Sequence, residues 1–179
     1  GIMGRFGWGT PTLVTIDLGI ILTLPSPTVN LIGSIRSIQP SEDHKILIIQ
    51  ANLFGRLDFR GKYVFFRAEL FDSFVAGFKI TGGLVFYVGW GNDDSSGFVL
   101  SVGGFHRDFT QLPTVPGLPN AFKGLDRVRF TMLDEKAGDP ASLWVECYFA
   151  LTSNAVMIGA AAHLYVDGPW GSWLKGDLS

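Results

Sequence analysis

The sequence predicts an all-β protein, made of long antiparallel strands that follow one another as a meander. Hydrophobic residues recur at every second position over most of the chain, and no helical period competes with them. Clusters of Gly, Pro, Asn, Asp and Ser separate these runs, as is typical of turns. The chain has 179 residues, of which 47% are hydrophobic, so it is able to bury a core.

The second half of the chain resembles the first, which is the other observation behind the predicted fold. Residues 46–49, 63–66 and 78–80 recur, at nearly constant spacing, as residues 143–145, 156–158 and 173–175. Repeats of this kind build extended sheets. We therefore expect two tandem five-strand units, at residues 1–90 and 91–179, and we expect both to be part of a longer protein.

In the first unit, strands are expected at residues 11–24, 29–38, 45–59, 63–72 and 74–89. The third of these places Leu47, Ile49 and Leu53 on one face and Gln50 and Asn52 on the other. This alternation predicts a strand with one buried face.

The next two strands repeat the alternation. Val64, Phe66 and Leu70 oppose Arg67 and Glu69. The last strand of the unit then sets Phe78 and Ile80 against Lys79. A hairpin between the third and fourth strands is expected, because Gly61 lies in the short polar turn between them.

In the second unit, strands are expected at residues 97–107, 126–134, 142–151, 155–167 and 170–178. Residues 91–97 are rich in Asn, Asp, Ser and Gly and predict a connecting loop. Residues 110–123 contain Pro113, Pro116 and Pro119, which cannot extend a strand ladder. We interpret this Pro-rich segment as an insertion, and it is the first loop in which function is expected.

Long strands with one apolar face need a cover. A second sheet, the facing wall of a barrel, a lipid acyl layer or a bound apolar ligand would each provide one. We expect an open curved sheet or groove, with a closed barrel or a sandwich as the alternatives.

The charge and the reactive residues exclude several classes of function. The formal net charge is -2 and no block of like charge occurs, so nucleic acid is not an expected partner. Ser101, His106 and Asp108 lie close in sequence but lack the strand-turn-helix context of a nucleophile. The three histidines have no metal-ligand spacing. We therefore predict no enzymatic activity, no catalytic residues, no metal and no cofactor.

The tryptophans are more informative than the acidic residues, because they gather near predicted strand ends. These residues are Trp8, Trp90, Trp170 and Trp173. Amphipathic aromatic side chains in such places suit a membrane interface or a carbohydrate-stacking platform. The structural alternative is that they cap the ends of a sandwich core.

Several stretches carry a resemblance to a known family: residues 101–106, residues 148–160, residues 7–11 and residues 70–73. They are similar to a family of large, uncharacterised bacterial β-rich proteins, some of them encoded near phage-tail-like contractile injection systems. In the family, the Gly-Gly-Phe-His stretch tends to continue with Pro, whereas Arg107 follows here. The resemblance implies injection-system proteins as partners and a bacterial origin, in the cell envelope or secreted, and it implies no activity.

The repeat also resembles, in architecture, the unit of repeating-β-groove lipid-transfer proteins. That resemblance implies an apolar binding face made of Leu47, Ile49, Leu53, Val64, Phe66, Leu70, Phe78, Ile80, Val145, Phe149, Ile158 and Leu164. The expected function is a non-enzymatic β-repeat segment that serves as a scaffold or as a groove for a lipid-like ligand. The alternatives are an outer-membrane or pore-forming barrel and a carbohydrate-binding sandwich.

Overall fold

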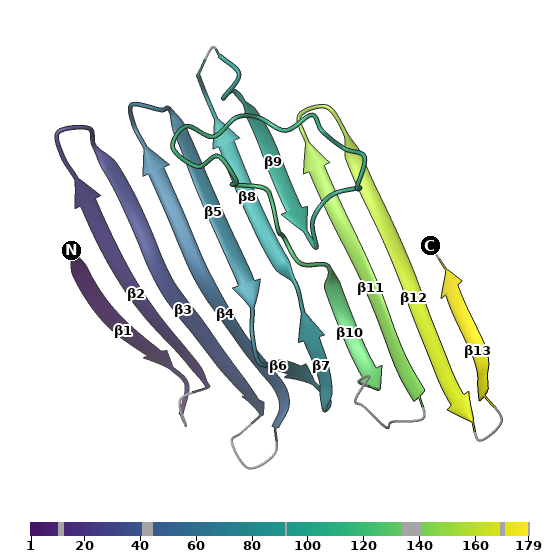
Figure 1. Cartoon of the computed structure of the whole chain (residues 1–179). Coiled ribbons are helices and arrows are strands. Elements are labelled where there is room, and N and C mark those ends of the chain that lie inside the picture. Colours follow the sequence, from purple (N-terminus) through teal and green to yellow (C-terminus); the bar gives the residue numbers. More distant parts are fainter. Residues whose placement is uncertain (11–12, 41–44, 92, 134–140, 169–170, 179) are drawn as a thin grey trace.

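A computed structural model describes residues 1–10, 13–40, 45–91, 93–133, 141–168 and 171–178. These residues form thirteen strands: β1 (Ile2–Trp8), β2 (Val14–Thr23), β3 (Thr28–Pro40), β4 (Lys45–Asp58), β5 (Tyr63–Leu70), β6 (Ser73–Val75), β7 (Phe78–Thr81), β8 (Gly83–Gly89), β9 (Gly97–Val102), β10 (Val128–Leu133), β11 (Ala141–Thr152), β12 (Val156–Gly168) and β13 (Gly171–Leu178). All of them belong to one sheet, and every pairing is antiparallel (Figure 1). The predicted all-β antiparallel fold is confirmed.

The sheet is open at both ends. β1 pairs with β2 and β13 pairs with β12, and neither has a second partner among the described strands. The described chain therefore forms one open sheet, rather than the closed barrel or the sandwich that were the alternatives.

Between β4 and β11 the sheet has two tiers of shorter strands. β5, β8 and β9 fill one half of this interval, and β6, β7 and β10 fill the other half (Figure 1). β5 gives way to β6 at Asp72, whose φ is 42°, and β9 is separated from β10 by residues 103–127. Each pair of short strands thus occupies the place of one long strand.

Most strand positions agree with the sequence prediction, with three differences. The strand expected at residues 97–107 ends at Val102, because Gly103 and Gly104 have positive φ angles of 79° and 86° and turn the chain out of the ladder.

The expected strand at residues 74–89 is divided into β6, β7 and β8. Ala76 and Gly77 have positive φ angles of 50° and 84° and turn the chain back between β6 and β7, and Gly82, with a φ of 156°, separates β7 from β8. β1 was not predicted, since three glycines in residues 1–7 weaken its alternation.

The predicted boundary between the two units, after residue 90, lies between β8 and β9. These two strands pair directly over residues 84–89 and 97–102, so both halves share one sheet. β4 and β5 are antiparallel neighbours, as are their predicted counterparts β11 and β12. The tandem repeat itself stays a prediction.

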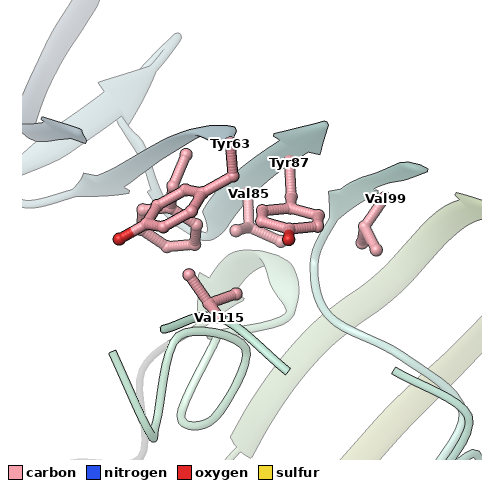
Figure 2. Packing of buried hydrophobic residues seen from close by; sticks show 6 residues of the cluster. Tyr63, Val85, Tyr87, Val99 and Val115 are labelled. Atoms are coloured by element: carbon pink, nitrogen blue, oxygen red, sulfur yellow. The ribbon is translucent and has the colours of Figure 1, made fainter. Parts of the chain in front are cut away.

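The core lies where residues 103–127, here called the covering segment, cross one face of the sheet (Figure 1). Tyr63, Val85, Tyr87 and Val99 point from the strands towards Val115 of this segment (Figure 2). With Phe65 they form the buried cluster. Complete burial of each such side chain contributes roughly 1.5–3 kcal/mol. The Pro-rich segment predicted as an insertion, residues 110–123, is therefore part of the covering segment and packs over the core.

The described residues contain no helix that is long and apolar enough to cross a membrane.

Candidate functional site

The pairing of the strands decides which side chains share a face, because residues directly opposite each other in a ladder point to the same side. The face under the covering segment is called the covered face, and the other is called the apolar face. Tyr63, Phe65 and Tyr87 mark the covered face. Their neighbours Val64 and Phe66 therefore point to the apolar face.

The apolar face continues from strand to strand across the sheet. Phe66 of β5 is opposite Phe86 of β8, which is opposite Leu100 of β9, which is opposite Leu151 of β11. The register places all the residues predicted for an apolar face on this one side: Leu47, Ile49, Leu53, Val64, Phe66, Leu70, Phe78, Ile80, Val145, Phe149, Ile158 and Leu164.

No charged residue lies on the apolar face among the strand residues whose side chains the structure describes. All of them lie on the covered face: Arg5, Asp17, Arg36, Arg56, Asp58, Arg67, Glu69, Lys79, Arg129, Glu146 and His163. Several of these form ion pairs with each other, such as Arg129 with Glu146 at 2.8 Å. The sheet is therefore strongly one-sided in charge.

Several side chains on the apolar face are open to solvent. Val156 and Ile158 of β12 are 65% and 75% exposed. At the other end of the sheet, Phe6 and Trp8 are also exposed. Of the described segments, only the covering segment crosses a face of the sheet, and it lies on the opposite side (Figure 1). The apolar face is thus an uncovered surface, and such surfaces commonly mark interaction sites.

On the covered face, polar side chains hold the covering segment by its main-chain carbonyl groups. Arg67 donates hydrogen bonds to the carbonyl oxygens of Lys123 and Gly124, both at 2.8 Å, and to that of Ala121 at 3.3 Å. The Tyr63 hydroxyl donates to the carbonyl oxygen of Pro116 at 2.7 Å. These bonds satisfy carbonyl groups that a loop crossing a sheet could not pair with a strand.

The exit of the covering segment is fixed in the same way. Arg127 donates to the carbonyl oxygens of Gly103 at 2.9 Å and Phe105 at 2.7 Å. Its guanidinium lies 3.9 Å from the ring centroid of Tyr148 on the covered face, which is a cation–π contact. Sequence reasoning missed these bonds, because they join residues that are far apart in the chain.

A hollow of about 1120 Å³ lies along β1, β2 and β3. Its walls include Met3, Ile21 and Ile32, together with the Arg5–Asp17 ion pair at 2.6 Å. The hydrogen bond from Arg5 is the main reason why the pKa of the Asp17 carboxyl is lower than its ordinary value. The hollow has a mixed lining and is open to solvent.

The predicted strand-end tryptophans are only partly described. Trp8 ends β1 and Trp90 follows β8, and both are exposed. The side chains of Trp170 and Trp173 lie outside the described residues. The structure does not bring Trp8 and Trp90 together on one strand pair, since β1 and β8 are far apart in the sheet order.

The polar residues near β9 have local structural contacts. The Ser101 hydroxyl is buried and donates to the carbonyl oxygen of Gly104 at 2.7 Å. His106 Nδ1 accepts a hydrogen bond from the Asp108 main-chain N–H at 3.3 Å. In the part of the chain that the structure describes, no group of His, Cys, Asp and Glu residues is placed to hold a metal ion.

These features define a class of protein: a single open antiparallel sheet with one charged, partly covered face and one apolar, uncovered face. The chain belongs to a family of unknown function, DUF6603, which matches residues 1–175. No curated protein and no solved structure matches the chain. Membership of this family assigns no ligand and no partner.

Proposed function

We propose that this chain is a non-enzymatic sheet segment whose apolar face binds the acyl chains of a lipid-like ligand. One observation carries the proposal: the apolar face has no charged strand residue among the described side chains, and no described segment covers it. Burial of apolar surface contributes about 25 cal/mol per Å², so covering such a face is strongly favourable.

The opposite face supports this assignment by contrast. Its aromatic cluster is already covered by the chain itself, and several of its charged residues, such as Arg67 and Arg129, are paired or hydrogen-bonded. The apolar face, by contrast, has no cover from any described segment (Figure 1). An acyl chain suits it because hydrocarbon requires no hydrogen-bonding groups from the surface.

The first test is to purify the protein without detergent, record native mass spectra and extract the sample with organic solvent. We expect a bound lipid in a fixed ratio to protein. A soluble particle free of lipid would contradict the proposal and favour a scaffold role. Insolubility that detergent reverses would favour the outer-membrane alternative instead.

A matched pair of double variants makes the test specific to one face. Phe78→Glu with Ile158→Glu adds two charges to the apolar face, where the wild-type side chains are 45% and 75% exposed. Phe74→Glu with Ile32→Glu adds the same charges to the covered face, at side chains that are 36% and 52% exposed.

We expect the first double variant to lose most of the bound lipid, because carboxylates under hydrocarbon are strongly unfavourable. The control variant should retain it. Equal retention in both variants would show that the apolar face is not the binding surface.

A further inference from the structure

The covering segment encloses a pocket of its own, of about 450 Å³, on the side of the sheet opposite the apolar face. This volume lies in the range of small-molecule sites, roughly 300–1,000 Å³. Every lining residue belongs to the covering segment, from Phe105 to Lys123. The pocket is therefore separate from the surface discussed under the proposed function.

Three aromatic rings of the covering segment surround this pocket. Phe105 and Phe109 are stacked, with ring centroids 6.3 Å apart and an angle of 19° between the planes. Phe122 meets Phe105 edge to face at 6.2 Å. Leu112, Val115 and Leu118 add aliphatic walls. Such a lining favours a flat aromatic guest, which stacks on one ring and meets another at its edge.

Contacts with the sheet fix the shape of the pocket in the absence of a ligand. Phe122 packs edge to face against Phe65 and Tyr87 of the buried cluster, at 6.2 Å and 5.7 Å. Arg67 binds the carbonyl groups of the lining residues Ala121 and Lys123, and that of Gly124, which follows them. Pre-organisation of this kind reduces the entropy that binding would otherwise cost.

The charged residue that lines the pocket indicates which charge on a ligand would be favourable. Lys123 is the one charged side chain among the lining residues, and it is exposed. Thr110 and Thr114 are the lining residues that carry hydroxyl groups. An anionic group placed at the rim would meet the Lys123 ammonium group, while the ring to which it is attached would lie among the phenylalanines.

We propose that the pocket in the covering segment binds a small aromatic carboxylate, with its ring against Phe105, Phe109 and Phe122 and its carboxylate at Lys123. This site is independent of lipid binding on the apolar face. The two proposals therefore fail separately.

The test uses 2-naphthoate, titrated into the full chain by calorimetry and followed by methyl NMR. We expect binding, with shifts at the methyl groups of Leu112, Val115 and Leu118 and none at Leu84 or Leu100 of the apolar face. The absence of binding at millimolar concentrations, or shifts confined to the apolar face, would overturn the proposal.

Two variants test separately the binding of the aromatic ring and the binding of the carboxylate. Thr110→Trp places a large ring at the pocket mouth from an exposed position, and we expect it to abolish binding of 2-naphthoate. Lys123→Gln should weaken 2-naphthoate by about two- to five-fold, the range of an exposed ion pair. It should leave the uncharged 2-naphthalenemethanol unaffected.

Arg107→Gln is the matched control, since Arg107 is an exposed cation of the same segment that does not line the pocket. It should bind 2-naphthoate as the wild type does, as should the apolar-face variant Phe78→Glu. An equal loss in Lys123→Gln and Arg107→Gln would show that only net charge matters and would overturn the assigned role of Lys123.

Discussion

Arg67 of β5 donates a hydrogen bond of 2.8 Å to the main-chain carbonyl oxygen of Lys123, a residue 56 positions later in the chain. The same guanidinium also binds the carbonyl groups of Ala121 and Gly124 and pairs with Glu69. One side chain of the sheet therefore fixes a whole turn of the covering segment.

Replacing Arg67 by Met should lower the free energy of unfolding by about 1–3 kcal/mol, because it leaves carbonyl groups without a donor. Urea denaturation would measure the change. Arg5→Met is the control, since the Arg5 guanidinium forms an exposed ion pair with Asp17 of the neighbouring strand β2. A similar loss of stability in both variants would show that Arg67 acts only through its charge.

Phe122→Ala should be the most destabilising change in the covering segment. Its ring contacts Phe65, Tyr87 and Phe105, so truncation leaves a cavity beside the buried cluster. Truncations of this type cost about 3–5 kcal/mol, and the lower end applies because Phe122 is only partly buried. Phe109→Ala is the comparison, since Phe109 has one ring contact, with Phe105. Thermal unfolding of the two variants in parallel would measure the difference. A lower stability of Phe109→Ala than of Phe122→Ala would contradict the prediction.

Alkaline pH should destabilise the fold through two buried tyrosines. Burial raises the pKa of Tyr63 and of Tyr87 above the ordinary value of 10.0. A raised pKa means that the folded state holds the proton longer than the unfolded state does. This stabilisation is complete below the unfolded pKa and is lost as the pH rises through the folded value.

The free energy of unfolding should therefore fall as the pH increases above about 10. The double variant Tyr63→Phe with Tyr87→Phe should show a flatter decrease. It should also be less stable at neutral pH, because the hydroxyl groups bind the carbonyl oxygens of Pro116 and Ser95. An unchanged alkaline slope would assign the effect to other groups.

Gly103→Ala should disrupt the point where β9 ends and the covering segment begins. Gly103 has a φ of 79°, and an added Cβ would lie 2.5 Å from the Cys147 carbonyl oxygen and 2.9 Å from the Val128 nitrogen. Gly124→Ala is the matched control, because Gly124 has a φ of 64° and its Cβ would meet nothing within 4 Å.

Both variants share the strain of a positive φ angle, about 1–3 kcal/mol at most. The difference between their unfolding free energies therefore reports the backbone clash alone. We expect Gly103→Ala to be clearly the less stable, and equal stabilities would show that the strand end can shift to admit a methyl group.

The alternation of side chains was predictable from the sequence because it is local. Leu47 and Ile49, or Val64 and Phe66, reveal their common face through spacing alone. The ladders then bring these strands together in the register that keeps apolar residues on one side, since a shift by one residue would mix the faces.

The position of the core was not predictable in this way. Tyr63, Phe65 and Tyr87 alternate with the apolar-face residues, and nothing in their spacing shows that Val115 and Phe122 would cover them. The bond from Tyr63 to Pro116 joins residues 53 positions apart. Contacts of this range depend on the path of residues 103–127 over the sheet, which periodicity does not describe.

The interrupted strand formed by β9 and β10 has a consequence for engineering and for divergence. Val102 lies opposite Phe149 and Val128 lies opposite Cys147, so one residue of β11 separates the two strand ends. A one-residue link in place of the covering segment would leave the ladder with β11 in register. Segments of very different length and chemistry could therefore be inserted between β9 and β10 without a change in the strand pairing. The apolar face of the sheet would stay the same.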